Sequence, residues 1–258
     1  MLFHLPIIRG VIDRRILVNF TVDPAVAAKL LPRPFRPKLV NGFAVAGICL
    51  IRLKQIRPRG WPAILGISSE NAAHRIAVEW DADGERREGV FIPRRDSNSI
   101  LNTWAGGRLF PGRHHHAAFK VWETRDRFQI SIETPDGALR VFVSAQVAQR
   151  FPPASVFGTL EAASAFFAAG SVGYSTTNQV DSYEGLELRS FKWTVEPLEV
   201  DKVESSFFKH IQWLATGSVQ FDCALLMRDI EHEWHERGGL PRDEFAAGQK
   251  WQPPCSST

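Results

Sequence analysis

The chain has 258 residues, which is enough for one large domain or two small ones. Its apolar content of 44% is ordinary and allows a sizeable core. The formal net charge is only +3 and the basic residues are scattered, so the sequence lacks the concentrated basic stretch that nucleic acid binding requires. A small acidic molecule remains a candidate partner, because one well-placed arginine can hold a carboxylate.

Cysteine usage and the chain ends indicate the compartment. The three cysteines lie far apart and form no CxxC pair, which argues against a disulfide framework and fits a reducing environment. The start, MLFHLPIIRGVIDRR, lacks the basic segment and long apolar core of a secretion signal. No run approaches the roughly 20 apolar residues of a membrane helix. We therefore expect a cytoplasmic protein without membrane or nucleic acid partners, with one domain over residues 1–245 and a flexible tail over 246–258.

The first predicted element is a helix over residues 23–32. Asp23 is placed to cap it, Pro24 suits its first position and Pro32 ends it. Period-two alternation then predicts a strand over residues 74–80. The sequence DADG follows as a turn, and GVFIP resumes extended structure.

The second half of the chain continues this pattern of short strands. Residues 127–133 alternate, and Asp136-Gly137 predicts a hairpin turn to a partner strand over 139–147. Two more helices and a final strand are expected, over 159–170, 205–214 and 219–227. Many short strands with few helices favour one β-rich α+β domain, built as a barrel or a sandwich.

Three consecutive histidines, His114 to His116, follow a glycine-rich turn and begin another predicted strand. On a strand His114 and His116 share one face, and His115 shares the other with an apolar series through Val121. Two histidines at i and i+2 can bind a metal, but a third ligand is needed, and there is no HExxH, CxxC or suitably spaced aspartate. We therefore expect no metal, with His115 packed inward.

Two further stretches carry ionisable groups into or beside apolar strands. In SSENAAHRIAV, Glu70 and Arg75 either face a pocket, where apolar walls raise the pKa of a carboxyl group, or lie in solvent. In IPRRDSNS, Arg94 either clamps a carboxylate or pairs with Asp96 in a turn. Spacing alone favours the structural interpretation of both stretches.

The late stretch DIEHEWHER is rich in histidine and glutamate, with His232 and His235 three residues apart. We interpret its glutamates as a solvated face. The motifs GxGxxG, the P-loop and GxSxG are all absent, which removes the common dinucleotide, nucleoside triphosphate and serine hydrolase interpretations. We expect no cofactor.

Five segments, in order, carry a family resemblance: LVNGFAVAGICLIRLKQIRPRGWP, SSENAAHRIAV, GVFIPRRDSNS, GGRLFPGRHHHAAF and ALLMRDIEHEWH. Together they resemble the DUF2071 family of bacterial proteins, which is similar in fold to acetoacetate decarboxylase. The resemblance covers most of the chain, from the first helix signal to HEWH. It implies an acetoacetate-decarboxylase-like closed, cone-shaped β-barrel with a few flanking helices and an internal small-molecule pocket, but the family name implies no activity.

The more distant similarity to the decarboxylase bears on the histidines. In that enzyme a segment of the form Gly-Arg-Glu, three residues, Phe-Pro-Lys-Lys supplies the lysine that forms a Schiff base with the ketoacid. Gly107-Arg108 resembles its start, and counting on without a gap aligns His115 and His116 with the two lysines. Imidazole forms no stable Schiff base with a ketone, so the resemblance does not imply decarboxylation.

The resemblance nevertheless implies a set of pocket residues. His115 is expected as a general acid or base, and Glu70, which resembles a pocket-lining glutamate of the decarboxylase, as a second one. The residues expected to hold a substrate, mainly through its negative charge, are Arg108, Arg75, Arg94 and His116.

Two classes of function stay open, and the sequence does not decide whether the protein is an enzyme. The first is a lyase- or isomerase-like enzyme that acts on a small carbonyl compound or carboxylic acid without a Schiff-base lysine. The second is a non-catalytic binding protein for a small apolar or carboxylated ligand. A catalyst predicts an ionisable pair in contact within the pocket, whereas a binder predicts an apolar cavity with one anchoring charge. An adaptor acting through its surface predicts no cavity, and a homo-oligomer is compatible with each.

Overall fold

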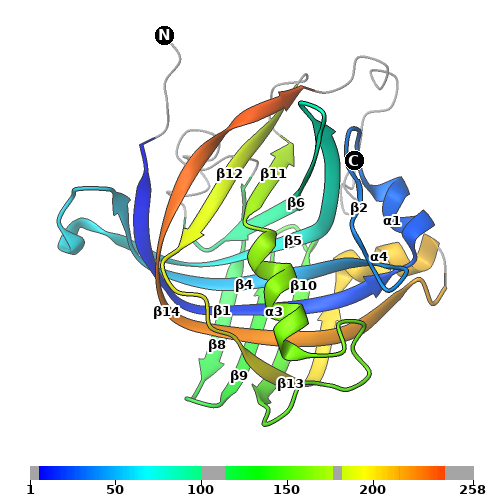
Figure 1. Cartoon of the computed structure of the whole chain (residues 1–258). Coiled ribbons are helices and arrows are strands. Elements are labelled where there is room, and N and C mark those ends of the chain that lie inside the picture. Colours follow the sequence, from blue (N-terminus) through cyan, green and yellow to red (C-terminus); the bar gives the residue numbers. More distant parts are fainter. Residues whose placement is uncertain (1–5, 100–113, 177–181, 215, 242–258) are drawn as a thin grey trace.

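The computed structural model describes residues 6–99, 114–176, 182–214 and 216–241, most of them in strands (Figure 1). The first seven strands are β1 (Ile8–Val22), β2 (Arg36–Pro37), β3 (Leu39–Val40), β4 (Phe43–Pro58), β5 (Ile67–Ala82), β6 (Glu85–Ser97) and β7 (His114–His116). The others are β8 (Ala118–Glu123), β9 (Arg127–Glu133), β10 (Arg140–Val147), β11 (Val172–Thr176), β12 (Ser182–Ser190), β13 (Glu196–Ser205) and β14 (Val219–Pro241). The helices are α1 (Pro24–Leu30), α3 (Leu160–Ala169), α4 (Ser206–Leu214) and the 3-10 turn η1 (Ala63–Leu65).

Local signals placed several elements correctly. The side chain of Asp23 accepts hydrogen bonds from the first-turn backbone of α1, and Thr159 caps α3 in the same way. Gly137 has a φ of 69° in the turn that joins β9 to β10, a left-handed conformation that glycine adopts without steric cost. The predicted strand that begins at His114 is interrupted, because Ala117 separates β7 from β8.

The strands form one sheet whose pairing returns to its start. Neighbouring strands follow in the order β1, β4, β5, β6, β11, β12 and β14. Strand β14 then pairs with β1 along almost the whole length of β1. From β14 the sheet continues through β13, β10, β9 and β8. Most pairs are antiparallel, and the exceptions in the described part of the chain are β6 with β11 and β6 with β7. These seven strands, β1, β4, β5, β6, β11, β12 and β14, are called the ring below.

The ring strands β1, β4, β5 and β14 present their two faces to two different cores. On β1 and β4, residues such as Ile16 and Leu50 pack in a cluster with Phe207 and Phe208 of α4. The alternate residues pack in a second cluster with Phe167 of α3. We call these sides the α4 face and the α3 face. Because side chains alternate along a strand, neighbouring residues in the sequence lie on opposite faces.

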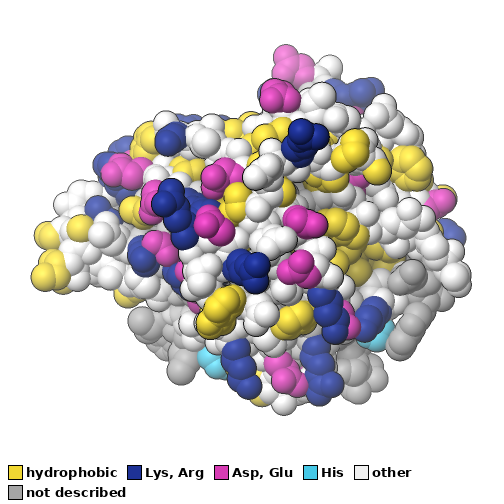
Figure 2. Space-filling model, turned by 90° about the horizontal axis from the view of Figure 1, so that it is seen from below, with side chains coloured by type: hydrophobic (Ala, Val, Ile, Leu, Met, Phe, Trp, Pro, Cys, Tyr) yellow, Lys and Arg dark blue, Asp and Glu magenta, His cyan; other side chains and the backbone are white. Residues whose placement is uncertain are grey.

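The structure bears on the predictions about membrane segments and surface charge, but not on those about the C-terminal tail and Arg108. None of the helices in the described residues is long and apolar enough to cross a lipid bilayer. Figure 2 shows positive and negative side chains interspersed on the face seen from below. The predicted tail over 246–258 and Arg108 both lie outside the described residues.

Candidate functional site

A pocket of about 70 Å³ is lined by residues of the ring strands β4, β5, β6, β12 and β14 and by β7. One buried water needs about 10–15 Å³ by this measure, so the pocket has room for several waters or a small organic molecule. The described residues that line it are Ile51, Leu53, Asn71, Ala72, Ala73, Arg95, Asp96, His114, Leu186 and Trp234. We call it the Arg95 pocket. Its walls are largely apolar, with a small number of polar groups.

Arg95 supplies the positive charge of the pocket. Its Nε donates a hydrogen bond to Ser175 Oγ on β11 at 3.2 Å, which holds the side chain across the β6–β11 junction. Burial lowers the pKa of Arg95 to about 10, so the guanidinium is charged at neutral pH. No carboxylate in the described ranges pairs with it. A cation in this setting is suited to bind an anion from solution.

Asn71, His114 and Asp96 are the other polar residues of the pocket lining, and the carboxylate of Asp96 is held by Arg94. Asn71 Oδ1 accepts from Ser97 Oγ at 2.8 Å and its Nδ2 donates to Ser69 Oγ at 2.9 Å, which fixes the amide. His114 lies beside Arg95 in the parallel β6–β7 register and is half-buried. An imidazole in this position is the group best suited to exchange protons with a bound molecule at neutral pH.

The sequence-predicted Glu70 does not line this pocket. Its two carboxylate oxygens lie 2.5 Å from Arg14 Nη2 and 2.5 Å from Arg52 Nε. Glu123 completes the network through ion pairs with the same two arginines. These groups lie on the α4 side of the strands, where Glu70 neutralises buried or half-buried arginines.

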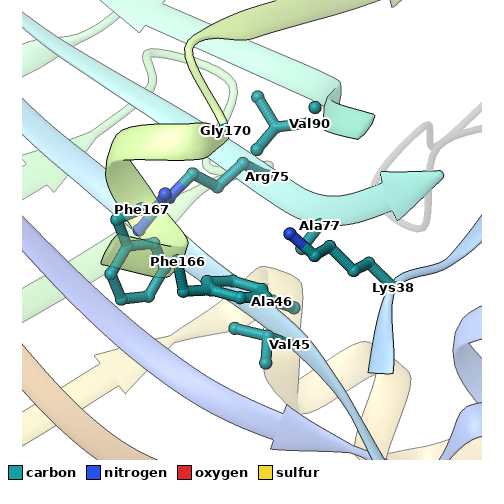
Figure 3. Close-up of a pocket in the computed structure, with 10 residues that line it drawn as sticks. Lys38, Val45, Ala46, Arg75, Ala77, Val90, Phe166, Phe167 and Gly170 are labelled. Atoms are coloured by element: carbon teal, nitrogen blue, oxygen red, sulfur yellow. The ribbon is translucent and has the colours of Figure 1, made fainter. Parts of the chain in front are cut away.

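Arg75 and Arg94 are also engaged elsewhere. Arg75 lines a separate cavity of about 10 Å³ beneath α3, where it extends toward Phe167 (Figure 3). Its Nη2 donates to Asn19 Oδ1 at 2.7 Å. Arg94 donates through Nε and Nη2 to Asp96, which is fully buried. Burial raises the pKa of Asp96, and the pairing with Arg94 opposes this rise.

The prediction that His115 packs inward is wrong, because its side chain is exposed and His114 lines the pocket instead. His115 shares its face with Asp96, whose pKa its positive charge lowers. His116 is exposed as well. Arg108, the fourth candidate anion holder, falls outside the described residues.

The sequence thus identified the correct stretches with an offset of one residue. Asn71, Arg95 and His114 line the pocket, whereas Glu70 and Arg94 lie on the other face. A shift of one residue in a strand moves a side chain to the opposite side of the sheet. The signal that could have corrected the offset is Ser97 in IPRRDSNS, which donates to Asn71 and lies on the same face of β6 as Arg95.

No group of three or more histidine, cysteine, aspartate or glutamate side chains within the described residues is arranged to hold a metal ion. The polar groups of the pocket lining are an arginine, an amide and an imidazole, together with the carboxylate of Asp96, which is paired with Arg94. Together with apolar walls they can bind a small anion, orient it and exchange a proton with it.

Comparison with known proteins gives the family and the fold. The DUF2071 family model, described as an uncharacterized conserved protein, matches residues 12–220. A search of curated proteins found no match. Among solved structures, acetoacetate decarboxylase from Legionella pneumophila subsp. pneumophila str. Philadelphia 1 is similar with a TM-score of 0.57 and 12% identity, over 91% of this chain and 88% of that chain.

Two other solved structures are similar to the same degree. An acetoacetate decarboxylase-like enzyme from Sphingomonas wittichii RW1 has a TM-score of 0.57 and 11% identity, over 93% of this chain and 94% of that chain. The enduracididine biosynthesis enzyme MppR complexed with pyruvate has a TM-score of 0.55 and 13% identity, over 95% and 93%. At these identities the similarity shows the fold, so the predicted acetoacetate-decarboxylase-like fold is confirmed.

Proposed function

This chain belongs to the DUF2071 family, and from that premise we propose that it binds a small carboxylic acid in the Arg95 pocket and moves a proton on it, as a lyase- or isomerase-like enzyme. The observation that carries the proposal is Arg95 itself. Its guanidinium is half-buried, is held by Ser175, and has no carboxylate partner among the described residues. A substrate carboxylate would supply the missing charge through two parallel N–H···O bonds.

The proton transfer is assigned to His114. With the carboxylate on Arg95, a C–H group next to a carbonyl would come within reach of the neighbouring imidazole. The C–H bond breaks, the proton moves to a ring nitrogen, and the electron pair delocalises onto the carbonyl oxygen as an enolate. The charge of Arg95 stabilises that oxygen. Return of the proton to carbon completes an isomerisation or an exchange.

A Schiff-base mechanism is not part of the proposal. The described residues that line the Arg95 pocket include no lysine. Lys120, which follows the histidines, is exposed on β8. The covalent mechanism needs a primary amine in the pocket, so the carbonyl chemistry proposed here is non-covalent.

We also propose that the ring is the closed, cone-shaped barrel expected for this fold, with the α3 face inside. In support, the buried strand residues of the α3-face cluster all come from the ring strands β1, β4, β5 and β14. The Arg95 pocket would then open into the barrel. Arg108, which lies outside the described residues, stays a predicted anion holder.

The second candidate function is a non-catalytic carrier of the same acids. The largely apolar walls and the single cation of the Arg95 pocket favour it. A carrier needs Arg95 and the apolar walls, but it does not need the imidazole of His114. The two candidates therefore differ in what removal of His114 does.

Pyruvate in D₂O separates these functions, since it is a small enolisable ketoacid whose methyl protons exchange through the enolate. We expect the protein to accelerate loss of the methyl ¹H signal. Arg95→Gln should weaken pyruvate binding at least tenfold in calorimetry, and His114→Gln should bind pyruvate without accelerating exchange. The matched control is Arg87→Gln, an exposed arginine paired with the exposed Glu85.

The outcomes are distinct. Binding without exchange in the unaltered protein assigns the carrier function. Absence of binding by pyruvate, acetate and butyrate alike overturns the proposal. Equal effects of Arg95→Gln and Arg87→Gln on binding would place the anion elsewhere.

A further inference from the structure

Three arginines approach one buried thiol on the α3 face. Cys49 on β4 is paired with Ala73 of β5, which is paired in turn with Arg95 of β6, and Arg75 lies two residues beyond Ala73. Arg15 Nε donates to Cys49 Sγ at 3.3 Å. Burial lowers the pKa of both Arg75 and Arg95 to about 10, while the charge of the Cys49 sulfur opposes this in each. Repulsion from Arg15 lowers the pKa of Arg75 further, so these cations share one electrostatic environment.

None of the three guanidinium groups meets a carboxylate in the described part of the chain. Arg15 contacts the sulfur atoms of Cys49 and Met227 and lies 5.9 Å from the ring centre of Trp193. These partners are weak acceptors or a ring face, and they leave the positive charge in place.

Arg75 is the most deeply buried of the three. Only 7% of it is exposed, and its Nε has no hydrogen-bond partner. Nη2 donates to the neutral amide of Asn19, and the guanidinium carbon lies 4.7 Å from the ring centre of Phe167. A buried charge with an unsatisfied donor is costly unless an anion occupies the site.

His232 adds a further unsatisfied group to the same face. It is fully buried on β14, where neither ring nitrogen makes a side-chain hydrogen bond of good geometry with the described residues, and the backbone of Ile230 lies near enough to oppose the lowering of its pKa by burial. Burial lowers the pKa of His232 to about 4, and Arg15 contributes to the lowering, so the imidazole is neutral at pH 7. Its ring centre lies 4.4 Å from that of Trp234, which lines the Arg95 pocket. His232 therefore adjoins the lining of the Arg95 pocket.

Charge counting then distinguishes classes of ligand. A monocarboxylate on Arg95 leaves Arg15 and Arg75 without an anion. A molecule with two carboxylates could use Arg95 at one end and the other two cations at the second. Arg75 and Arg95 are diagonal neighbours on β5 and β6, which places their backbones roughly 7–8 Å apart. The cavity of about 10 Å³ beside Arg75 has room for one carboxylate oxygen (Figure 3).

We infer that the small acid bound by this protein is a dicarboxylate of four or five carbons, with one carboxylate on Arg95 and the other between Arg75 and Arg15 beside Cys49. This inference rests on the proposed function of the Arg95 pocket. His232 donates one ring N–H toward the second carboxylate.

The test compares acids of equal length with one or two carboxylates. Calorimetric titration with butyrate, succinate and glutarate should show that one of the two dicarboxylates binds at least tenfold more tightly than butyrate. Arg75→Gln and Arg15→Gln should each reduce that affinity to the level of butyrate and leave butyrate binding unchanged. Arg95→Gln should weaken all three acids, and the control Arg87→Gln should change none. Thermal unfolding verifies each fold, and either Arg75→Gln or Arg15→Gln suffices if the other does not fold.

Failure of this inference is distinguishable from failure of the proposed function. If butyrate binds as tightly as succinate and glutarate, or if the excess affinity survives Arg75→Gln and Arg15→Gln, the second carboxylate site is refuted while the pocket stands. If sulfate matches the best dicarboxylate, a single compact dianion occupies the arginines and the two-ended ligand is refuted. If no acid binds, the proposed function falls with it.

Discussion

Arginines on the two faces of the same strands differ in whether a carboxylate of the chain pairs with them. Arg14 and Arg15 are neighbours on β1, and Arg94 and Arg95 are neighbours on β6. On the α4 face, Arg14 pairs with Glu70 and Arg94 pairs with Asp96. On the α3 face, Arg15 and Arg95 have no carboxylate partner in the described residues.

The difference separates a face whose charges are matched within the chain from the face on which we propose a ligand site. Buried charges that serve the fold are matched by partners within the chain, because an unmatched one destabilises the folded state. Arg14 and Arg94 follow this rule. Groups that break the rule without compensation are expected at sites that meet a ligand. The predictions below try to break this distinction, beginning with the largest expected effect.

Removal of Arg94 should be far more damaging than removal of Arg95. In Arg94→Met the fully buried Asp96 loses its ion pair with Arg94, and we expect a loss of about 3–5 kcal/mol in the free energy of unfolding. In Arg95→Met no carboxylate of the described residues is left without its partner, so the change should stay within about 1 kcal/mol. Urea denaturation of both variants measures the difference. Equal losses would show that the two faces are energetically alike.

Each face has a fully buried histidine among the described residues, His74 or His232, and these two make the stability depend on pH. The pKa of His74, on the α4 face, is lowered to about 3 by burial and the charge of Arg94, and that of His232, on the α3 face, to about 4. In the unfolded chain both titrate near 6.5, so as pH falls below 6.5 the unfolded state takes up protons that the folded state does not. Stability should therefore fall between pH 6.5 and 4 and should be unaffected by these groups above 6.5.

Variants assign the slope to each histidine. In His232→Gln one histidine no longer takes up a proton on unfolding. The slope of the free energy of unfolding against pH should therefore decrease by about 1.4 kcal/mol per pH unit over that range. Saturating succinate should reduce the His232 part, because a nearby anion favours the imidazolium, and should leave the part removed by His74→Gln unchanged. Denaturation curves at several pH values provide the measurement. An equal effect of succinate on both parts would contradict the assignment of the ligand to the α3 face.

Much of the fold follows from local signals in the sequence. Asp23, Thr159 and Asp136-Gly137 each specify a cap or a turn with a direct chemical reason, and each lies where it was expected. The period-two pattern over residues 127–133 corresponds to β9 without displacement. These features depend on interactions within a few residues, which is why one sequence suffices to place them.

The site was harder to predict because adjacent residues compete for the same role. The pairs Glu70-Asn71 and Arg94-Arg95 each offer chemically plausible groups to both faces, and only the register of the sheet selects one. His114 depends in addition on the short parallel pairing of β7 with β6.

Arg15 and His232, the other residues of the proposed site, could not be predicted because their position depends on pairing between distant strands. Arg15 and His232 come from opposite ends of the chain, and the pairing of β1 with β14 brings them close enough that, in addition to burial, the charge of Arg15 lowers the pKa of His232. Residue spacing contains no sign of that pairing. His232 was interpreted as part of a solvated stretch, whereas it is fully buried.

Glu70 tests the same distinction through a residue that the sequence favoured as an acid or base. Glu70→Gln removes one of the carboxylates that neutralise Arg14 and Arg52, while Glu123 remains. We expect a loss of about 1–3 kcal/mol in stability, with no change in carboxylate affinity or in pyruvate exchange. Chemical denaturation and calorimetry measure the two effects separately. Loss of exchange at unchanged stability would return Glu70 to a catalytic role.

The smallest expected effect is the most discriminating, because its sign decides between the two faces. Arg75→Gln loses the contact with the Phe167 ring but relieves a buried cation whose Nε has no partner, and a glutamine can still donate to Asn19. These terms nearly cancel, so we expect the empty protein to change by less than about 1 kcal/mol, toward higher stability. Saturating succinate should reverse the order, since it stabilises only the protein that retains the arginine. Thermal unfolding of both proteins with and without succinate reads the sign directly. A clear destabilisation without succinate that succinate does not widen would make Arg75 a structural arginine like Arg94, and the α3 face would lose its distinction.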